Sequence, residues 1–279
     1  MSTTSPNAKH LILKMLLAFD DNPLTARDLI VACSIFDISE NSVRVALVRL
    51  SSAGMVQAAG RGSYRLGPQA RELADDVARW RSLEQRVRPW NGQFVVVHAS
   101  ILGRSDRAAL RQRERALQML GLRELERGLY VRPDNLEDNV DAVRHRLYSL
   151  GLEREAGVFL ASGFDTERET LARQLWDGKA LNASYRKGRM QLEDWLSRAD
   201  ELEPDVAARE SFLLGGSAIR QMVFDPWLPE PLVDVQERHA FVDVVRRYDD
   251  AGRRFWKRFY EFSTGQIVGG TALTESRTH

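Results

Sequence analysis

Polar and basic residues recur on one side of the segment 39–66, at a spacing suited to contacts with double-stranded DNA. Ser39 is a good helix N-cap, because its hydroxyl can accept a hydrogen bond from a free backbone N–H of the first turn. Apolar residues at helical intervals then predict one buried face, formed by Val43, Ala46, Leu47 and Leu50. The opposite face carries side chains that can contact phosphates and base edges and touch thymine methyl groups, namely Asn41, Ser42, Arg44, Val45, Val48 and Arg49.

A two-stranded wing is predicted directly after this helix. Gly54 is a natural helix terminator, and Gly60-Arg61-Gly62 separates two short β runs. Arg61 and Arg65 are therefore expected to contact phosphate or the minor groove. Within the helix, Asn41, Ser42 and Arg49 are expected near bases and Arg44 nearer the backbone. The predicted DNA-binding residues are Ser39, Asn41, Ser42, Arg44, Arg49, Arg61 and Arg65.

Two amphipathic helices precede the predicted recognition helix, at residues 8–19 and 26–36. Thr25 is the expected N-cap of the second of these helices. Each feature taken alone is common in proteins that bind no nucleic acid. The order of helix, helix, capped helix and hairpin is much less common, and it predicts an N-terminal winged helix-turn-helix.

Composition sets the broad class of the protein. A chain of 279 residues with 43% hydrophobic and 28% charged residues is typical of a globular protein with two or three domains. No apolar run approaches the roughly 18 residues of a membrane helix, and the first residues lack the hydrophobic stretch of a signal peptide. The single Cys33 excludes an intrachain disulfide and indicates a cytoplasmic protein.

The hydrophobic pattern predicts three domains within a mainly α chain that also has an α+β part. Residues 1–88 contain the DNA-binding domain and a linker helix at 69–88, which is a candidate dimer contact. Residues 89–165 alternate strand, helix, strand, helix and strand, which predicts a small α+β sandwich. Residues 166–279 are mostly helical, with a proline-rich break at 225–231.

Three segments together resemble the phenylacetate-operon repressor family, the PaaX-like regulators. The first runs from Ser39 through Leu66. The second is WNGQFVVV from Trp90, followed by Arg107, Leu110-Arg111, Leu117, Gly121-Leu122 and GLYVRP from Gly128. The third is Arg220 with FDPWLPEPL from Phe224, which is similar to the family's Asp-Pro-x-Leu-Pro signature.

The resemblance implies a ferredoxin-like middle domain, a C-terminal helical domain and a bacterial transcriptional regulator. Such a regulator is usually a homodimer that represses an aromatic-acid catabolic operon from a palindromic operator and is released by an aryl-acetyl-CoA thioester. The sequence departs from the family pattern in places. Phe94 and Tyr130 stand where tryptophans are usual, and 235–237 lacks the Trp-x-Gly that often follows the signature. Because of these departures, the resemblance implies the class of effector and does not specify phenylacetyl-CoA.

A CoA thioester offers phosphates, which call for arginines, and an acyl group, which calls for aromatic side chains. The candidate effector-binding residues are Arg107, Arg111, Arg186, Arg189, Trp195 and Trp227.

The sequence contains no constellation that predicts an enzyme, a cofactor site or a metal site. The five histidines are not paired at HxH or HxxxH spacing, and no cysteine cluster accompanies them. Two alternatives to a regulator stay open. In one, the middle domain is a metal-dependent nuclease, with Asp165 as a ligand. In the other, the winged helix is a module that binds another protein.

Overall fold

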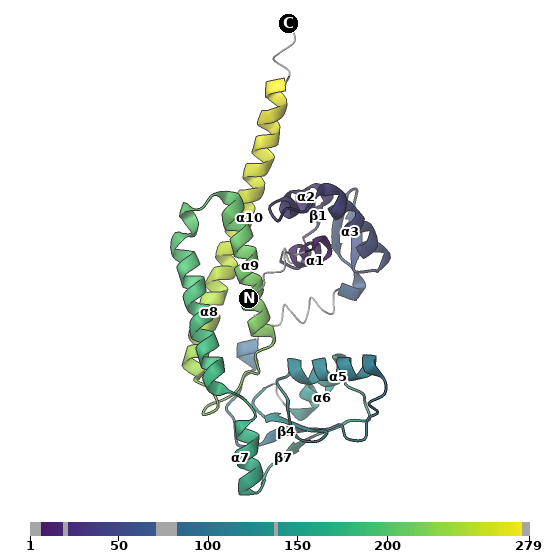
Figure 1. Cartoon of the computed structure of the whole chain (residues 1–279), viewed down its shortest axis with the longest axis vertical. Helices are drawn as coiled ribbons and strands as arrows, with labels where there is room; N and C mark the ends of the chain where they lie inside the picture. Colours follow the sequence, from purple (N-terminus) through teal and green to yellow (C-terminus); the bar gives the residue numbers. More distant parts are fainter. Residues whose placement is uncertain (1–6, 19–21, 71–82, 137–138, 275–279) are drawn as a thin grey trace. The chain divides into compact units, whose positions relative to one another are not determined.

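The computed structural model describes residues 7–18, 22–70, 83–136 and 139–274, with side chains as far as residue 263. The chain is mainly helical and contains two antiparallel sheets (Figure 1), so the predicted mixture of α and α+β structure is confirmed at that level. Two compact units form. The first comprises residues 1–78, 195–216 and 247–279, and the second comprises residues 79–194 and 217–246.

The N-terminal part of the first unit combines three helices with a three-stranded sheet (Figure 1). The strand order is β1-β3-β2, and all pairs are antiparallel. The helix at 8–19 and the Thr25 cap are confirmed to within a residue, because Thr25 Oγ1 accepts from the Asp28 N–H at 3.1 Å. The elements in chain order are α1 Ala8–Ala18, β1 Leu24–Thr25, α2 Ala26–Ser34, α3 Glu40–Ser52, β2 Val56–Gly60 and β3 Ser63–Leu66.

Three long helices occupy the C-terminal part of the chain, and each contributes segments to both units. In the first unit, aromatic side chains of the helices at 204–223 and 235–274 complete the core beneath α1, α2 and α3. The rings of Phe36 and Phe212 pack edge to face, with centroids 5.4 Å apart, and Trp256 and Phe259 are buried in the same cluster. These helices are α8 Gly178–Arg198, α9 Pro204–Val223 and α10 Val235–Thr274, with a short 3-10 turn η3 Ala199–Glu201 after α8.

The second unit is built on a four-stranded antiparallel sheet of order β5-β6-β4-β7. The sequence pattern predicts one strand between the two helices of this region, and this is wrong in detail, because residues 123–133 form a hairpin of two strands. Gly128 forms the turn at φ +76°, where a Cβ would lie 2.7 Å from the Ser100 Cα. The elements are η2 Leu83–Arg86, β4 Phe94–His98, α5 Arg107–Met119, β5 Arg123–Glu126, β6 Leu129–Pro133, α6 Val140–Ser149, β7 Gly157–Ala161 and α7 Thr166–Gln174.

Both faces of this sheet are covered. Val95 and Val97 of β4 point into a core shared with α5 and α6, which lie together on one face of the sheet (Figure 1). Phe94 and Val96 point to the other face, where Trp176 and the segment around Leu228 pack against them. Because successive side chains of β4 point to opposite faces of the sheet, this one strand contributes to two hydrophobic cores.

Some sequence predictions stay untested by the structure. Most of the linker helix predicted at 69–88 falls on residues 71–82, which lie outside the described residues. The division into domains at 1–88, 89–165 and 166–279 also stays a prediction. Within the described residues, no helix is long and apolar enough to cross a membrane.

Candidate nucleic-acid interface

Helix α3 is held at both ends by local hydrogen bonds. Ser39 caps the start, as its Oγ accepts from the Ser42 N–H at 3.3 Å. At the end, the Met55 N–H donates to Leu50 O and the Gly54 N–H donates to Ser51 O, both at 3.0 Å. This pair of bonds is a Schellman motif, and Gly54 occupies its left-handed position with φ +64°. The predicted cap and terminator are therefore confirmed.

The predicted division of α3 into two faces is also confirmed. Val43, Ala46, Leu47 and Leu50 are buried in the core of the first unit. The candidate contact residues Ser39, Asn41, Ser42, Arg44 and Arg49 are all exposed. The fold of this segment thus leaves the whole polar side of α3 accessible to a partner.

The exposed polar residues of α3 differ in whether their side chains already form hydrogen bonds or ion pairs within the protein. Arg44 is paired with Glu40, one turn earlier, through a contact of 2.6 Å from Nη2 to Oε1. The Ser39 and Ser42 hydroxyls lie 2.9 Å apart, so Ser39 serves the cap. The Arg49 side chain forms no hydrogen bond or ion pair with another described residue. Arg49 is therefore the most readily available cation of this helix.

The predicted wing is a hairpin of β2 and β3 with Arg61 at its exposed tip. Gly62 adopts φ +73°, and open space surrounds the tip. Arg65 lies opposite Gln57 across the hairpin. With the Gln57 amide oxygen assigned toward it, the Arg65 Nε donates to that oxygen at 2.7 Å. Arg65 is thus oriented by a neighbour, whereas Arg61 forms no ion pair within the described part of the chain.

A further basic residue near the wing was not predicted from the sequence. The Ala26 N–H donates to Gly62 O at 2.9 Å, so the first turn of α2 lies against the tip of the hairpin. The next residue, Arg27, is exposed. The pairing of β1 with β3 creates this proximity. The two-residue strand Leu24–Thr25 that makes it is too short to be recognised by its pattern.

The candidate effector residues do not form one cluster in the structure. Arg107 and Arg111 are exposed on α5. Arg186 and Arg189 both lie near the Glu237 carboxylate, at 3.6 Å and 3.9 Å. Trp195 belongs to the first unit, whereas the other five residues belong to the second.

Both candidate tryptophans are core residues. Trp195 is fully buried, with its ring centroid 4.7 Å from that of Tyr248. Trp227 is 2% exposed, beneath the Arg238 guanidinium at 5.2 Å from its ring. Neither tryptophan therefore presents a surface to a ligand in this conformation.

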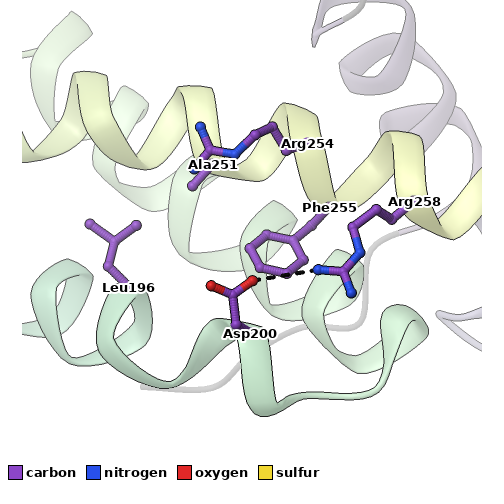
Figure 2. Close-up of a pocket in the computed structure, with 6 residues that line it drawn as sticks. All are labelled: Leu196, Asp200, Ala251, Arg254, Phe255 and Arg258. Atoms are coloured by element: carbon purple, nitrogen blue, oxygen red, sulfur yellow. Dashed lines mark hydrogen bonds and ion pairs between the residues drawn. The ribbon is translucent and has the colours of Figure 1, made fainter.

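A small pocket of about 180 Å³ lies elsewhere in the first unit. Figure 2 shows its lining, in which the Arg258 guanidinium points toward the Asp200 carboxylate at 3.4 Å. The lining residues are Leu196, Asp200, Ala251, Arg254, Phe255 and Arg258. None of the predicted effector residues belongs to it.

The signature at 225–229 is a buried polar junction. Asp225 Oδ1 accepts from the Trp227 N–H at 2.7 Å, and the Asn135 side chain donates to Trp227 O at 2.7 Å. Burial raises the pKa of the Asp225 carboxyl, against the opposing effects of that N–H and of the Arg238 charge. The junction fastens the proline-rich segment to the end of β6, which is a structural role.

The Asp165 carboxylate forms its hydrogen bonds and its ion pair with α7, the helix that it caps. It caps α7 by accepting from the Arg168 N–H at 2.8 Å, and it pairs with the Arg168 side chain. These hydrogen bonds lower the pKa of Asp165. Among the described residues, no three acidic, histidine or cysteine side chains gather in a way that could hold a metal ion. The structure therefore does not favour the nuclease alternative.

Models of known protein families match the chain in two places. A model described as PaaX-like protein matches residues 8–70, and one described as PaaX-like protein C-terminal domain matches residues 176–258. Together they cover more than half of the sequence. The chain belongs to the PaaX-like family. The first match contains the whole candidate interface, and the second contains the buried junction of this PaaX-like protein.

One solved structure is similar to this PaaX-like protein along most of its length. It is described as uncharacterized protein Rv0674 from Mycobacterium tuberculosis, with 22% sequence identity and a TM-score of 0.57. The similarity covers 88% of this chain and 99% of the other. At that identity, the comparison concerns the fold alone. No curated protein matches the chain.

Proposed function

We propose that this PaaX-like protein is a DNA-binding transcriptional regulator whose N-terminal segment is a winged helix-turn-helix. The observation that carries the proposal is the exposed polar face of α3, next to a hairpin with a free arginine at its tip. A capped helix with one accessible face can enter the major groove, while a basic hairpin contacts the adjacent backbone.

The proposed DNA contacts follow from the exposure of each side chain and from whether it already has a partner within the protein. Asn41, Ser42 and Arg49 are expected near base edges, and Arg44 nearer a phosphate once it leaves Glu40. Arg61 and Arg65 are expected on the phosphates or in the minor groove. Arg27 is added as a phosphate contact, because it lies beside the wing tip. Ser39 is assigned to the cap, and its contribution to DNA binding is indirect.

The finer proposal follows the family resemblance. The protein is proposed to be a cytoplasmic homodimer that represses an operon for aromatic or acyl catabolism and is released by an acyl-CoA effector. The three-domain organisation includes a ferredoxin-like middle domain, which the strand order β5-β6-β4-β7 and the helices α5 and α6 support. No chemical step is assigned to the protein.

The effector site of this proposal draws on the accessible arginines. Arg107 and Arg111 lie four residues apart on the exposed side of α5, where two guanidinium groups can hold phosphates. Arg186 and Arg189 would first have to leave Glu237. Trp195 and Trp227 would contribute only after a rearrangement of their cores.

A gel-shift titration on the DNA upstream of the gene tests the proposal. The wild-type protein is expected to bind this fragment more tightly than a random fragment of equal length, and phenylacetyl-CoA is expected to release it. Arg49→Gln is expected to weaken binding, whereas Lys179→Gln, an equal charge change at an exposed position of α8, is expected to have little effect. No preference for the upstream fragment at low salt would contradict the proposal and favour a protein-interaction module.

A further inference from the structure

An apolar pair lies at the centre of the exposed face of α3. Val48 is 67% exposed and Val45 is 41% exposed. A single exposed valine is ordinary on a protein surface. These two, however, are successive members of one row, because Asn41, Val45, Val48 and Ser52 recur at intervals of four, three and four residues. The row is directly opposite the buried face that contains Val43 and Leu50.

Cations lie on both sides of this row. Arg44 precedes Val45 and Arg49 follows Val48, so helical geometry sends their side chains to opposite flanks. The only carboxylate on α3 is Glu40, in the first turn. The exposed face is therefore apolar along its middle and basic along its two margins.

This arrangement matches a B-DNA major groove. The two margins of the groove are phosphate strands, and its floor presents base edges. Among those edges, the C5-methyl of thymine is the apolar group that an aliphatic side chain can cover. Valine has no donor or acceptor, so it distinguishes bases by that methyl group.

We propose that Val45 and Val48 read thymine methyl groups, an inference that rests on the proposed DNA-binding function. The operator half-site then contains at least one thymine whose methyl group lies under the middle of α3. Arg49 favours duplex DNA as the occupant of this face over an apolar protein surface, because its guanidinium has no carboxylate partner among the described residues and would be costly to bury.

The test is to remove the methyl groups from the DNA. The upstream fragment is amplified once with dTTP and once with dUTP, which replaces every thymine by uracil without changing base pairing. Wild-type protein is expected to bind the uracil fragment about fourfold more weakly for each methyl group that the valines cover, from ~0.8 kcal/mol per buried methyl-sized group. Equal affinity for the two fragments would overturn the inference.

Two variants separate methyl recognition from a general change in DNA shape. The double variant Val45→Ala, Val48→Ala is expected to bind both fragments with nearly equal affinity, and alanine in place of an exposed helical valine retains the fold. Arg61→Gln is expected to bind more weakly but to keep the full preference for thymine. Full preference in the double variant would overturn the inference and assign the effect to DNA shape.

A failure of the proposed function is distinguishable from these results. In that case, the thymine fragment itself would bind no better than random DNA of equal length. Circular dichroism of each variant, compared with wild type, identifies any decrease in binding that comes from unfolding.

Discussion

Arg44 Nη2 lies 2.6 Å from the Glu40 Oε1, one helical turn away on the exposed face of α3. Both side chains are more than half exposed, so the pair contributes little to stability, typically under about 1 kcal/mol. The pair matters for binding, because Glu40 neutralises the Arg44 guanidinium until an external anion competes for it.

Glu40→Gln is expected to tighten DNA binding about two- to fivefold, because it frees Arg44 and removes a negative charge close to the phosphates. The melting temperature is expected to change little, because the exposed ion pair with Arg44 and the favourable charge at the helix N-terminus each contribute little to stability. Gel-shift titrations at two salt concentrations measure the effect. Glu155→Gln, an equal charge change on an exposed loop, is the control, and weaker binding by Glu40→Gln would contradict the prediction.

Arg49→Ala is expected to weaken binding to the upstream DNA by about 1–3 kcal/mol if its guanidinium reads a guanine. The same titration on random DNA distinguishes the two roles of this residue. A decrease that is equal on both fragments would mean that Arg49 contacts only phosphate. A decrease confined to the upstream fragment would establish base recognition.

Arg61→Gln is expected to reduce the dependence of affinity on salt. Each phosphate contact releases counterions, so the slope of log affinity against log salt is expected to fall by about 0.9. Fluorescence anisotropy over a series of salt concentrations gives this slope. If the slope equals that of wild type, the wing tip is not in contact with phosphate.

Gly54→Ala is expected to destabilise the protein by about 1–3 kcal/mol, because alanine must then adopt the left-handed conformation of the Schellman motif. An added Cβ would also lie 1.7 Å from the Gln69 Oε1, so that side chain must move. Urea denaturation measures the destabilisation. Gly62→Ala is the matched control, since its φ is also positive but nothing lies within 4 Å of the added atom, and an equal destabilisation in both would exclude the clash as a contributor.

Cys33 provides a probe of the first unit's core. Burial raises the pKa of the Cys33 thiol to about 12, so at pH 8 its thiolate fraction is roughly a thousandfold below that of a free cysteine. Reaction with a thiol reagent is expected to be very slow in the native protein and fast in urea. Rapid labelling under native conditions would show that α2 opens readily.

Local features of the candidate interface were predictable from the sequence. The cap at Ser39, the terminator at Gly54 and the buried face around Val43 all depend on residues only a few positions apart. The β5–β6 hairpin was not predictable in the same way, because the residues on either side of Gly128 form one continuous β pattern in the sequence. The structure shows that a turn at Gly128 divides this pattern into two strands. The position of Arg27 escapes prediction for a related reason, since it depends on a two-residue strand.

The effector candidates illustrate the limits of residue type as evidence. Trp195 and Trp227 are aromatic side chains suited to an aryl group, yet both are buried in packed cores. Arg186 and Arg189 are cations suited to phosphates, yet both lie near Glu237, about fifty residues further along the chain. A charge pattern identifies candidates for binding, but it contains no information on which of them are already neutralised.

The sequence by itself determined the periodicity, the caps and the turns of α3 and its wing, because these depend on backbone geometry and on neighbours within one or two turns. Only the tertiary structure decided which polar groups remain free. The Asn135 side chain donates to the Trp227 carbonyl across 92 residues of chain, and the Trp227 side chain is buried in a core. Such pairings follow from the satisfaction of buried polar groups in three dimensions, which no local pattern encodes.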